Sequence, residues 1–266
     1  MNEWMLGYLL LGAVAGFFAG LLGVGGGAIM VPVLALMFSA QGFPKEHLMH
    51  LALGTSMAAI VFTSISSLRA HHRHGAVHWN IVRTITPGIL VGTFAGAQLA
   101  SVMPTRPLAI FFVVFMSYVS FQMLANIKPK PSRQLPGALG MFGVGSGIGA
   151  LSALVAIGGG SLTVPFLTWC NIKMHHAIGT SAAVGFPIAV AGSLGYMVGG
   201  VVGGDPPAGS FGYIYLPALA ACVVASMLTA PLGAKAAHGL PVAVLKKIFA
   251  GVILLLLAKM VHGLFF

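Results

Sequence analysis

The feature that most constrains the fold is a series of ten apolar segments, five in each half of the chain. A helix of about 20 apolar residues can cross a hydrocarbon core about 30 Å thick, where the backbone must satisfy its own hydrogen bonds. The segments are residues 5–22, 27–40, 47–70, 80–102, 106–126, 137–156, 159–170, 174–202, 212–235 and 241–264. They predict an all-α polytopic membrane protein.

Charge supports this prediction, because only 6% of the residues are charged, whereas soluble domains carry about 25%. A net charge of +10 on a soluble protein would suggest nucleic acid as a partner. Here the basic residues lie in short loops between apolar segments, as is typical of cytoplasmic loops, so we expect no nucleic-acid binding. Residues 1–4 lack the basic region and cleavage site of a signal peptide, and we expect the first helix to be retained.

The two halves repeat each other. Gly25-Gly26-Gly27 with Val31-Pro32 matches Gly158-Gly159-Gly160 with Val164-Pro165, and His50 with Gly54-Thr55-Ser56 matches His175 with Gly179-Thr180-Ser181. We therefore expect one transmembrane domain built from a first repeat (1–127), a cytoplasmic linker (128–136) and a second repeat (137–266).

The distribution of basic residues predicts the orientation. One assignment puts ten of the thirteen lysines and arginines on the cytoplasmic side, leaving out Lys45, Arg106 and Lys259. The ten are Arg69, Arg73, Arg83, Lys128, Lys130, Arg133, Lys173, Lys235, Lys246 and Lys247. In this assignment the repeats have inverted topology and both termini lie on the outer side of the plasma membrane.

The first two segments of each half are too short to cross the membrane twice. Without its glycine turn, the stretch 5–40 holds about 31 helical residues, or about 46 Å at 1.5 Å per residue, whereas two crossings need about 60 Å. We expect each pair to be re-entrant, with its glycine turn inside the membrane. Each repeat then consists of a short glycine-tipped helix pair plus three transmembrane helices.

The two glycine tips form a candidate anion site. The helix after each tip begins with unpaired N–H groups and the positive end of its dipole, and glycine lets a ligand approach the backbone closely. A pair of interrupted segments in corresponding positions of two halves is typical of a transporter's binding site. The alternative is that these glycines only allow close helix packing. The candidate substrate-binding residues here are Gly25, Gly26, Gly27, Gly158, Gly159, Gly160 and Ser161.

Side chains at similar depth extend this site. The hydroxyls of Thr55, Ser56, Thr180 and Ser181 could donate to the oxygens of an anion, or instead bond to carbonyls of their own helices. His50 and His175, a matched ionisable pair, are candidate gating residues, with packing at the membrane interface as the alternative.

The sequence lacks residues suited to proton relay within the membrane, to metal or redox chemistry, and to catalysis. The three acidic residues, Glu3, Glu46 and Asp205, stand at ends or in loops, so no carboxylate is expected to relay protons in the membrane. Cys170 and Cys222 form no metal or redox motif. No constellation of catalytic residues is present, and we expect neither an enzyme, a metal site nor a cofactor.

The motifs together resemble the sulfite exporter TauE/SafE family. They are residues 19–27 with Val31-Pro32, 52–56, 70–79, 157–160 with Val164-Pro165, and 177–181. The resemblance implies export of sulfur-containing anions such as sulfite, sulfoacetate or related organosulfonates across the bacterial inner membrane. His78 stands where the family's loop often has Asp before its Trp, which leaves a salt bridge of that loop in doubt.

The favoured hypothesis is an exporter of small anions that works by alternating access of two inverted halves. Its expected partners are a small anionic substrate, the lipid bilayer and further copies of itself in a homo-oligomer. The alternatives are an uptake transporter or channel for another small anion, a membrane enzyme acting on a small sulfur compound, and a membrane subunit without transport activity.

Overall fold

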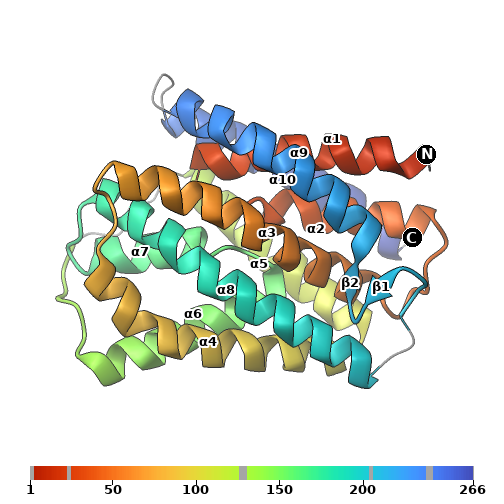
Figure 1. The fold of residues 1–266 in the computed structure, drawn as a ribbon, viewed down its shortest axis with the longest axis horizontal. Coiled ribbons are helices and arrows are strands. Elements are labelled where there is room, and N and C mark those ends of the chain that lie inside the picture. Colours follow the sequence, from red (N-terminus) through yellow and green to blue (C-terminus); the bar gives the residue numbers. More distant parts are fainter. Residues whose placement is uncertain (1–2, 23–24, 126–130, 204–205, 238–241, 266) are drawn as a thin grey trace.

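The computed structural model describes residues 3–22, 25–125, 131–203, 206–237 and 242–265. Within these ranges it has ten helices and a two-stranded hairpin (Figure 1). The elements are α1 (Glu3–Leu22), α2 (Gly27–Ala40), α3 (Leu48–Arg73), α4 (Trp79–Val102), α5 (Thr105–Leu124), α6 (Ala138–Val155), α7 (Gly160–Trp169), α8 (Met174–Gly203), β1 (Ser210–Phe211), β2 (Ile214–Tyr215), α9 (Leu216–Ala237) and α10 (Val242–Phe265). Lys128, Lys130 and Asp205, used above, lie outside the described residues.

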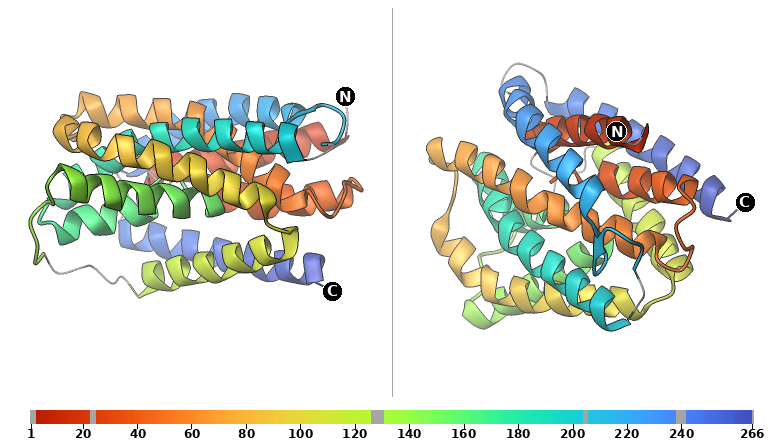
Figure 2. Two further views of the ribbon diagram at one scale, coloured as in Figure 1. Left: turned by 90° about the horizontal axis from the view of Figure 1, so that it is seen from below. Right: turned by 45° about the vertical axis from the view of Figure 1, so that its right-hand side comes forward.

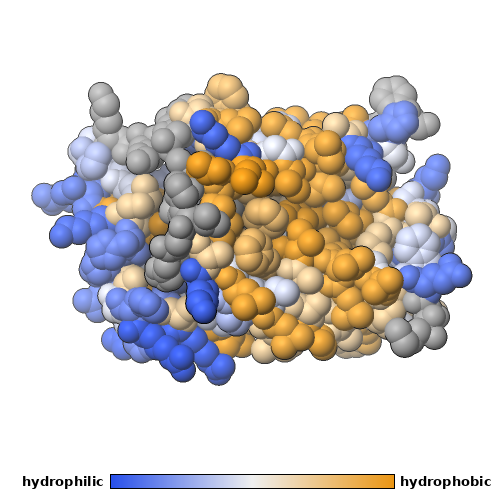
Figure 3. Space-filling view, turned by 90° about the horizontal axis from the view of Figure 1, so that it is seen from above, coloured by the Kyte–Doolittle hydropathy of each residue, from blue (hydrophilic) through white to orange (hydrophobic). Residues whose placement is uncertain are grey.

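The helices confirm the all-α polytopic membrane fold. Their axes run roughly along the long axis of the molecule, and the surface shows an apolar band between two hydrophilic ends (Figures 1 and 3). Among the described residues, seven helices are long and apolar enough to cross a membrane: α1, α3, α4, α5, α6, α8 and α9. Because α1 and α6 are among them, the expectation that these two stop inside the membrane stays a prediction.

One predicted helix began at the wrong residue. We expected a helix from residue 212, but residues 210–215 form an antiparallel hairpin with Ser210 opposite Tyr215 and Phe211 opposite Ile214. Gly209 and Gly212 have φ values of 85° and 57°, in the left-handed region that favours glycine and turns. The apolar run across this hairpin concealed the turn, and α9 begins only at Leu216.

The two longest helices, α3 and α8, pack against each other and form the centre of the protein. Both are largely buried: in the most apolar 18-residue stretch of each helix, 83% of the stretch is buried in α3 and 72% in α8. Around them α1 packs on α9, α4 on α6, and α5 on α10. The first to fifth helices of one half correspond to the first to fifth of the other. The contact of α1 with α9 therefore corresponds to that of α6 with α4, and the pairs α3–α8 and α5–α10 correspond to themselves.

Glycines bring the outer pairs into backbone contact. A Cβ on Gly12 of α1 would lie 2.5 Å from the carbonyl oxygen of Cys222 on α9. A Cβ on its counterpart, Gly145 of α6, would lie 2.5 Å from the carbonyl oxygen of Ile85 on α4. These contacts are the close approach that small residues allow between membrane helices.

The two short helix pairs are hairpins that open toward opposite ends of the molecule (Figures 1 and 2). Gln41, after α2, donates its side-chain N–H to the Tyr8 hydroxyl of α1 at 2.6 Å. Trp169, at the end of α7, donates its indole N–H to the Ser132 hydroxyl, just before α6, at 2.8 Å. The glycine turn of each hairpin therefore lies toward the interior.

Alanine substitutions on α6 test the packing role of its glycines. We expect Gly145→Ala to lower the midpoint of thermal unfolding, because the new methyl group must displace the backbone of Ile85, and overpacking typically costs about 1–3 kcal/mol. Gly143→Ala is the matched control, since a Cβ there meets nothing within 4 Å and alanine is the better helix former. Equal midpoints for the two variants would contradict the packing role.

Candidate functional site

Each glycine tip turns the chain directly into a short helix. Gly26 precedes α2 with a φ of 75°, and Gly159 precedes α7 with a φ of 85°, while Gly25 has a φ of 83°. Residues that carry a side chain rarely adopt this left-handed backbone conformation, which explains why glycine occupies these positions. The sharp turns leave the first N–H groups of α2 and α7 at the tips.

The structure brings the two tips together. A Cβ on Gly25 would lie 3.0 Å from the Cα of Gly158, and a Cβ on Gly27 would overlap the carbonyl oxygen of Ala156. The tips also touch a central helix, because a Cβ on Gly185 of α8 would lie 2.6 Å from the carbonyl oxygen of Gly158. Residues distant in the sequence thus meet at backbone distance inside the protein.

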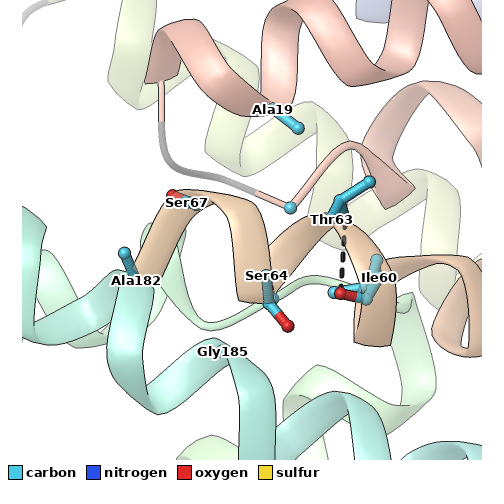
Figure 4. A pocket seen from close by; sticks show the side chains of 9 residues that line it. Ala19, Ile60, Thr63, Ser64, Ser67, Ala182 and Gly185 are labelled. Atoms are coloured by element: carbon cyan, nitrogen blue, oxygen red, sulfur yellow. Dashed lines mark hydrogen bonds between the residues drawn. The ribbon is translucent and has the colours of Figure 1, made fainter. Parts of the chain in front are cut away.

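A small pocket opens where the tips meet α3 and α8 (Figure 4). Three glycines, three hydroxyl-bearing residues and three other apolar residues line it: Gly25, Gly158, Gly185, Thr63, Ser64, Ser67, Ala19, Ile60 and Ala182. No charged side chain is among these described residues. The polarity of the pocket therefore comes from backbone groups and hydroxyls alone.

Sequence reasoning missed all the hydroxyl-bearing residues that line the pocket. Thr63 donates its hydroxyl to the carbonyl of Ile60 at 3.2 Å, and Ser64 donates to the carbonyl of Val61 at 2.9 Å. The hydroxyl oxygen of Ser67 is buried and has no hydrogen-bond partner among the described residues. The signal that could have found them is a run of hydroxyls in the first half without counterparts in the second.

The predicted serines lie close to this pocket. Ser56 and Ser181 are fully buried, and neither hydroxyl has a partner within the described part of the chain. Each stands four residues, about one helical turn, before a lining residue of its own helix, Ile60 on α3 and Gly185 on α8. Both serines therefore belong to the helix faces that turn toward the tips.

The predicted threonines, by contrast, accept hydrogen bonds from the backbone just before α9 and α4. Thr55 accepts a hydrogen bond from the backbone N–H of Tyr215 at 3.0 Å, and Thr180 accepts one from the N–H of His78, also at 3.0 Å. Each threonine thereby fixes the segment that leads into a helix of the other half. Their role in substrate binding stays a prediction.

Other tip residues surround the pocket without lining it. Gly26 packs on the Ala15 carbonyl, Gly160 is buried, and Ser161 is half-buried. A Cβ on Gly159 would lie 2.8 Å from the side chain of Ile188 and 3.3 Å from the hydroxyl of Thr163. The predicted set of glycines is thus brought together, but only Gly25 and Gly158 line the cavity.

The two predicted gating histidines lie at helix starts, in different surroundings. His50, buried in α3, donates its Nε2–H to the carbonyls of Met103 at 2.9 Å and Ala100 at 3.1 Å, which ties α3 to the end of α4. The ring of His175 lies beside that of His176, with centroids 3.9 Å apart and the planes tilted by 40°. A gating role for either residue stays a prediction.

His78, in the loop between α3 and α4, lies beside the pair formed by His175 and His176. Its ring lies 4.4 Å from that of His176. Burial, with a further contribution from His176 and His175, lowers the pKa of His78 below its ordinary value. No group of residues suited to a metal ion occurs within the described ranges.

Comparisons with known proteins show the family of the chain. Residues 8–260 match the family profile described as "Sulfite exporter TauE/SafE". A Haemophilus influenzae protein named "Probable membrane transporter protein" is 39% identical over 94% of this chain and 95% of its own length. The Bacillus subtilis "Probable membrane transporter protein YdhB" is 29% identical over 89% of this chain and 90% of its own. No solved structure matches.

Substitutions at Thr180 test its structural contact. We expect Thr180→Val, which keeps the branched shape but removes the acceptor for the His78 N–H, to cost about 1 kcal/mol of stability. Thr180→Ser keeps the hydroxyl and should lose less. The free energies of unfolding of the purified variants decide this, and a valine variant as stable as the serine variant would contradict the role.

Proposed function

Because the chain belongs to the sulfite exporter TauE/SafE family, we propose that this membrane transporter exports small sulfur-containing anions such as sulfite, sulfoacetate or related organosulfonates. The observation that carries the proposal is the meeting of two glycine-tipped helix starts at a small pocket whose described lining residues carry no charge. Relatives named as membrane transporters support transport rather than enzymatic chemistry.

The electrostatics of the tips favour an anion. The N-terminus of a helix carries the equivalent of about half a positive elementary charge, and α2 and α7 both begin beside the pocket. The unpartnered hydroxyls of Ser56 and Ser181 add donors close by. An anion can be held in this way without the desolvation cost of a buried lysine or arginine.

Alternating access of two inverted halves is the proposed mechanism. It is supported by the helix pairs that map onto each other between halves and by hairpins that open toward opposite ends. In our proposal the end that carries Arg73 faces the cytoplasm of a bacterial cell, and both termini lie outside. An interior-negative potential then favours anion export by about 2.3 kcal/mol per charge per 100 mV.

Flux measurements on the full chain in liposomes test this function. We expect labelled sulfite or sulfoacetate to leave interior-negative vesicles through the wild-type protein. Gly25→Ala should reduce this flux at least tenfold, because the methyl group is strained at a φ of 83° and reaches toward Gly158. The matched control, Gly251→Ala on α10, has open space around its Cβ and should transport normally.

The outcomes separate the function from the site. Absence of flux for every small oxyanion would overturn the proposed function. Flux only into the vesicles would indicate uptake, and flux that does not saturate would indicate a channel. Normal transport by a folded Gly25→Ala variant would leave transport intact but remove the glycine tips as its site.

A further inference from the structure

The side-chain hydroxyls of the pocket all lie on one side of it. Along α3, hydroxyl-bearing side chains continue past Ser56 at Thr63, Ser64 and Ser67. Counted from the shared Gly-Thr-Ser triplets, the corresponding residues of α8 are Ile188, Ala189 and Gly192, which carry no hydroxyl. The wall contributed by α8 consists instead of Ala182 and Gly185 (Figure 4). One central helix thus supplies all the side-chain hydroxyls of the pocket.

Ser67 differs from its two neighbours in this wall. The hydroxyls of Thr63 and Ser64 already donate to carbonyls of their own helix turn. The Ser67 hydroxyl oxygen is shielded from solvent and has no such partner among the described residues. Most buried polar groups in native proteins are hydrogen-bonded, so an unpaired donor that lines a pocket calls for a ligand. Of the three hydroxyls in this wall, only that of Ser67 has no partner among the described residues.

The position of Ser67 also gives the direction of access. It lies on the last turns of α3, which ends with His71, His72 and Arg73. Toward the other end the corresponding face of α8 is closed by apolar contacts, since a Cβ on Gly159 meets Ile188 at 2.8 Å and one on Gly192 meets the Met57 sulfur at 3.1 Å. The hydroxyl-bearing wall therefore leads from the pocket toward the basic end of α3.

We propose that Ser67 contacts the substrate, donating its hydroxyl to an oxygen of a small oxyanion that reaches the pocket from the basic end of α3. This assignment rests on the proposed function and makes the first half of the chain responsible for side-chain recognition of the anion. The backbone N–H groups of the two tips attract any anion. The Ser67 hydroxyl adds a directed hydrogen bond that favours an oxyanion.

Binding of sulfite and sulfoacetate to the purified full chain tests the proposal. We expect Ser67→Ala to weaken binding about tenfold, because a hydrogen bond to a charged group is lost. Ser67→Thr keeps the hydroxyl and should bind within about threefold of wild type. Without ligand, Ser67→Ala should be at least as stable as wild type, because an unpaired buried hydroxyl has been removed.

Ser193→Ala is the matched control. Ser193 is a buried serine of the other central helix that does not line the pocket, and its hydroxyl donates to the Ala189 carbonyl at 2.6 Å. It should bind both anions as wild type does. Unchanged affinity in a folded Ser67→Ala variant, or the same loss in Ser67→Thr, would overturn the assignment of Ser67 alone. Failure of the wild type to bind any oxyanion would overturn the proposed function and this assignment with it.

Discussion

Backbone contact between the two glycine tips is the constraint on which the rest of the structure depends. Gly25 and Gly27 reach Gly158 and Ala156 because no side chain intervenes, and Gly185 lets α8 approach the same point. Polar backbone deep inside a membrane protein is stable only where it is buried in protein or lines a cavity. The long helices α3 and α8 provide that cover on either side of the tips. The pocket is the space left between these closely packed parts.

Much of this arrangement could be predicted from the sequence. The thickness of the membrane sets the length of a spanning helix, and its apolar interior restricts where a glycine turn can interrupt one. The bounds of most helices and the pairing of the tips at Gly25 and Gly158 belong to this part. The hairpin before α9 was missed because Phe211, Tyr213, Ile214 and Tyr215 run without a polar break into the apolar helix that follows. For such residues, the turn at Gly212 and the pairing of Phe211 with Ile214 decide the structure.

The side chains of the site were harder to predict, because the repeat drew attention to residues that occur in both halves. Thr55 and Thr180 are such a matched pair, but each accepts a backbone hydrogen bond from the segment that precedes a helix of the other half. The pocket's hydroxyls come from α3 alone, where the repeat breaks down. A hydroxyl that bonds to its own helix and one that has no partner look the same in a sequence. Only packing distinguishes Ser64 from Ser67.

The hydrogen bonds of Thr55 and Thr180 have a consequence for how the protein is made. Each connects one half of the chain to the other, and the main packing partner of α1 is α9 of the second half. A chain is synthesised from its N-terminus, so the first half enters the membrane before the surfaces that complete it exist. Its helices can insert singly, but their native packing must wait for the second half. Neither repeat is therefore a folding unit, and a chain cut at residues 128–136 would have to assemble as two fragments.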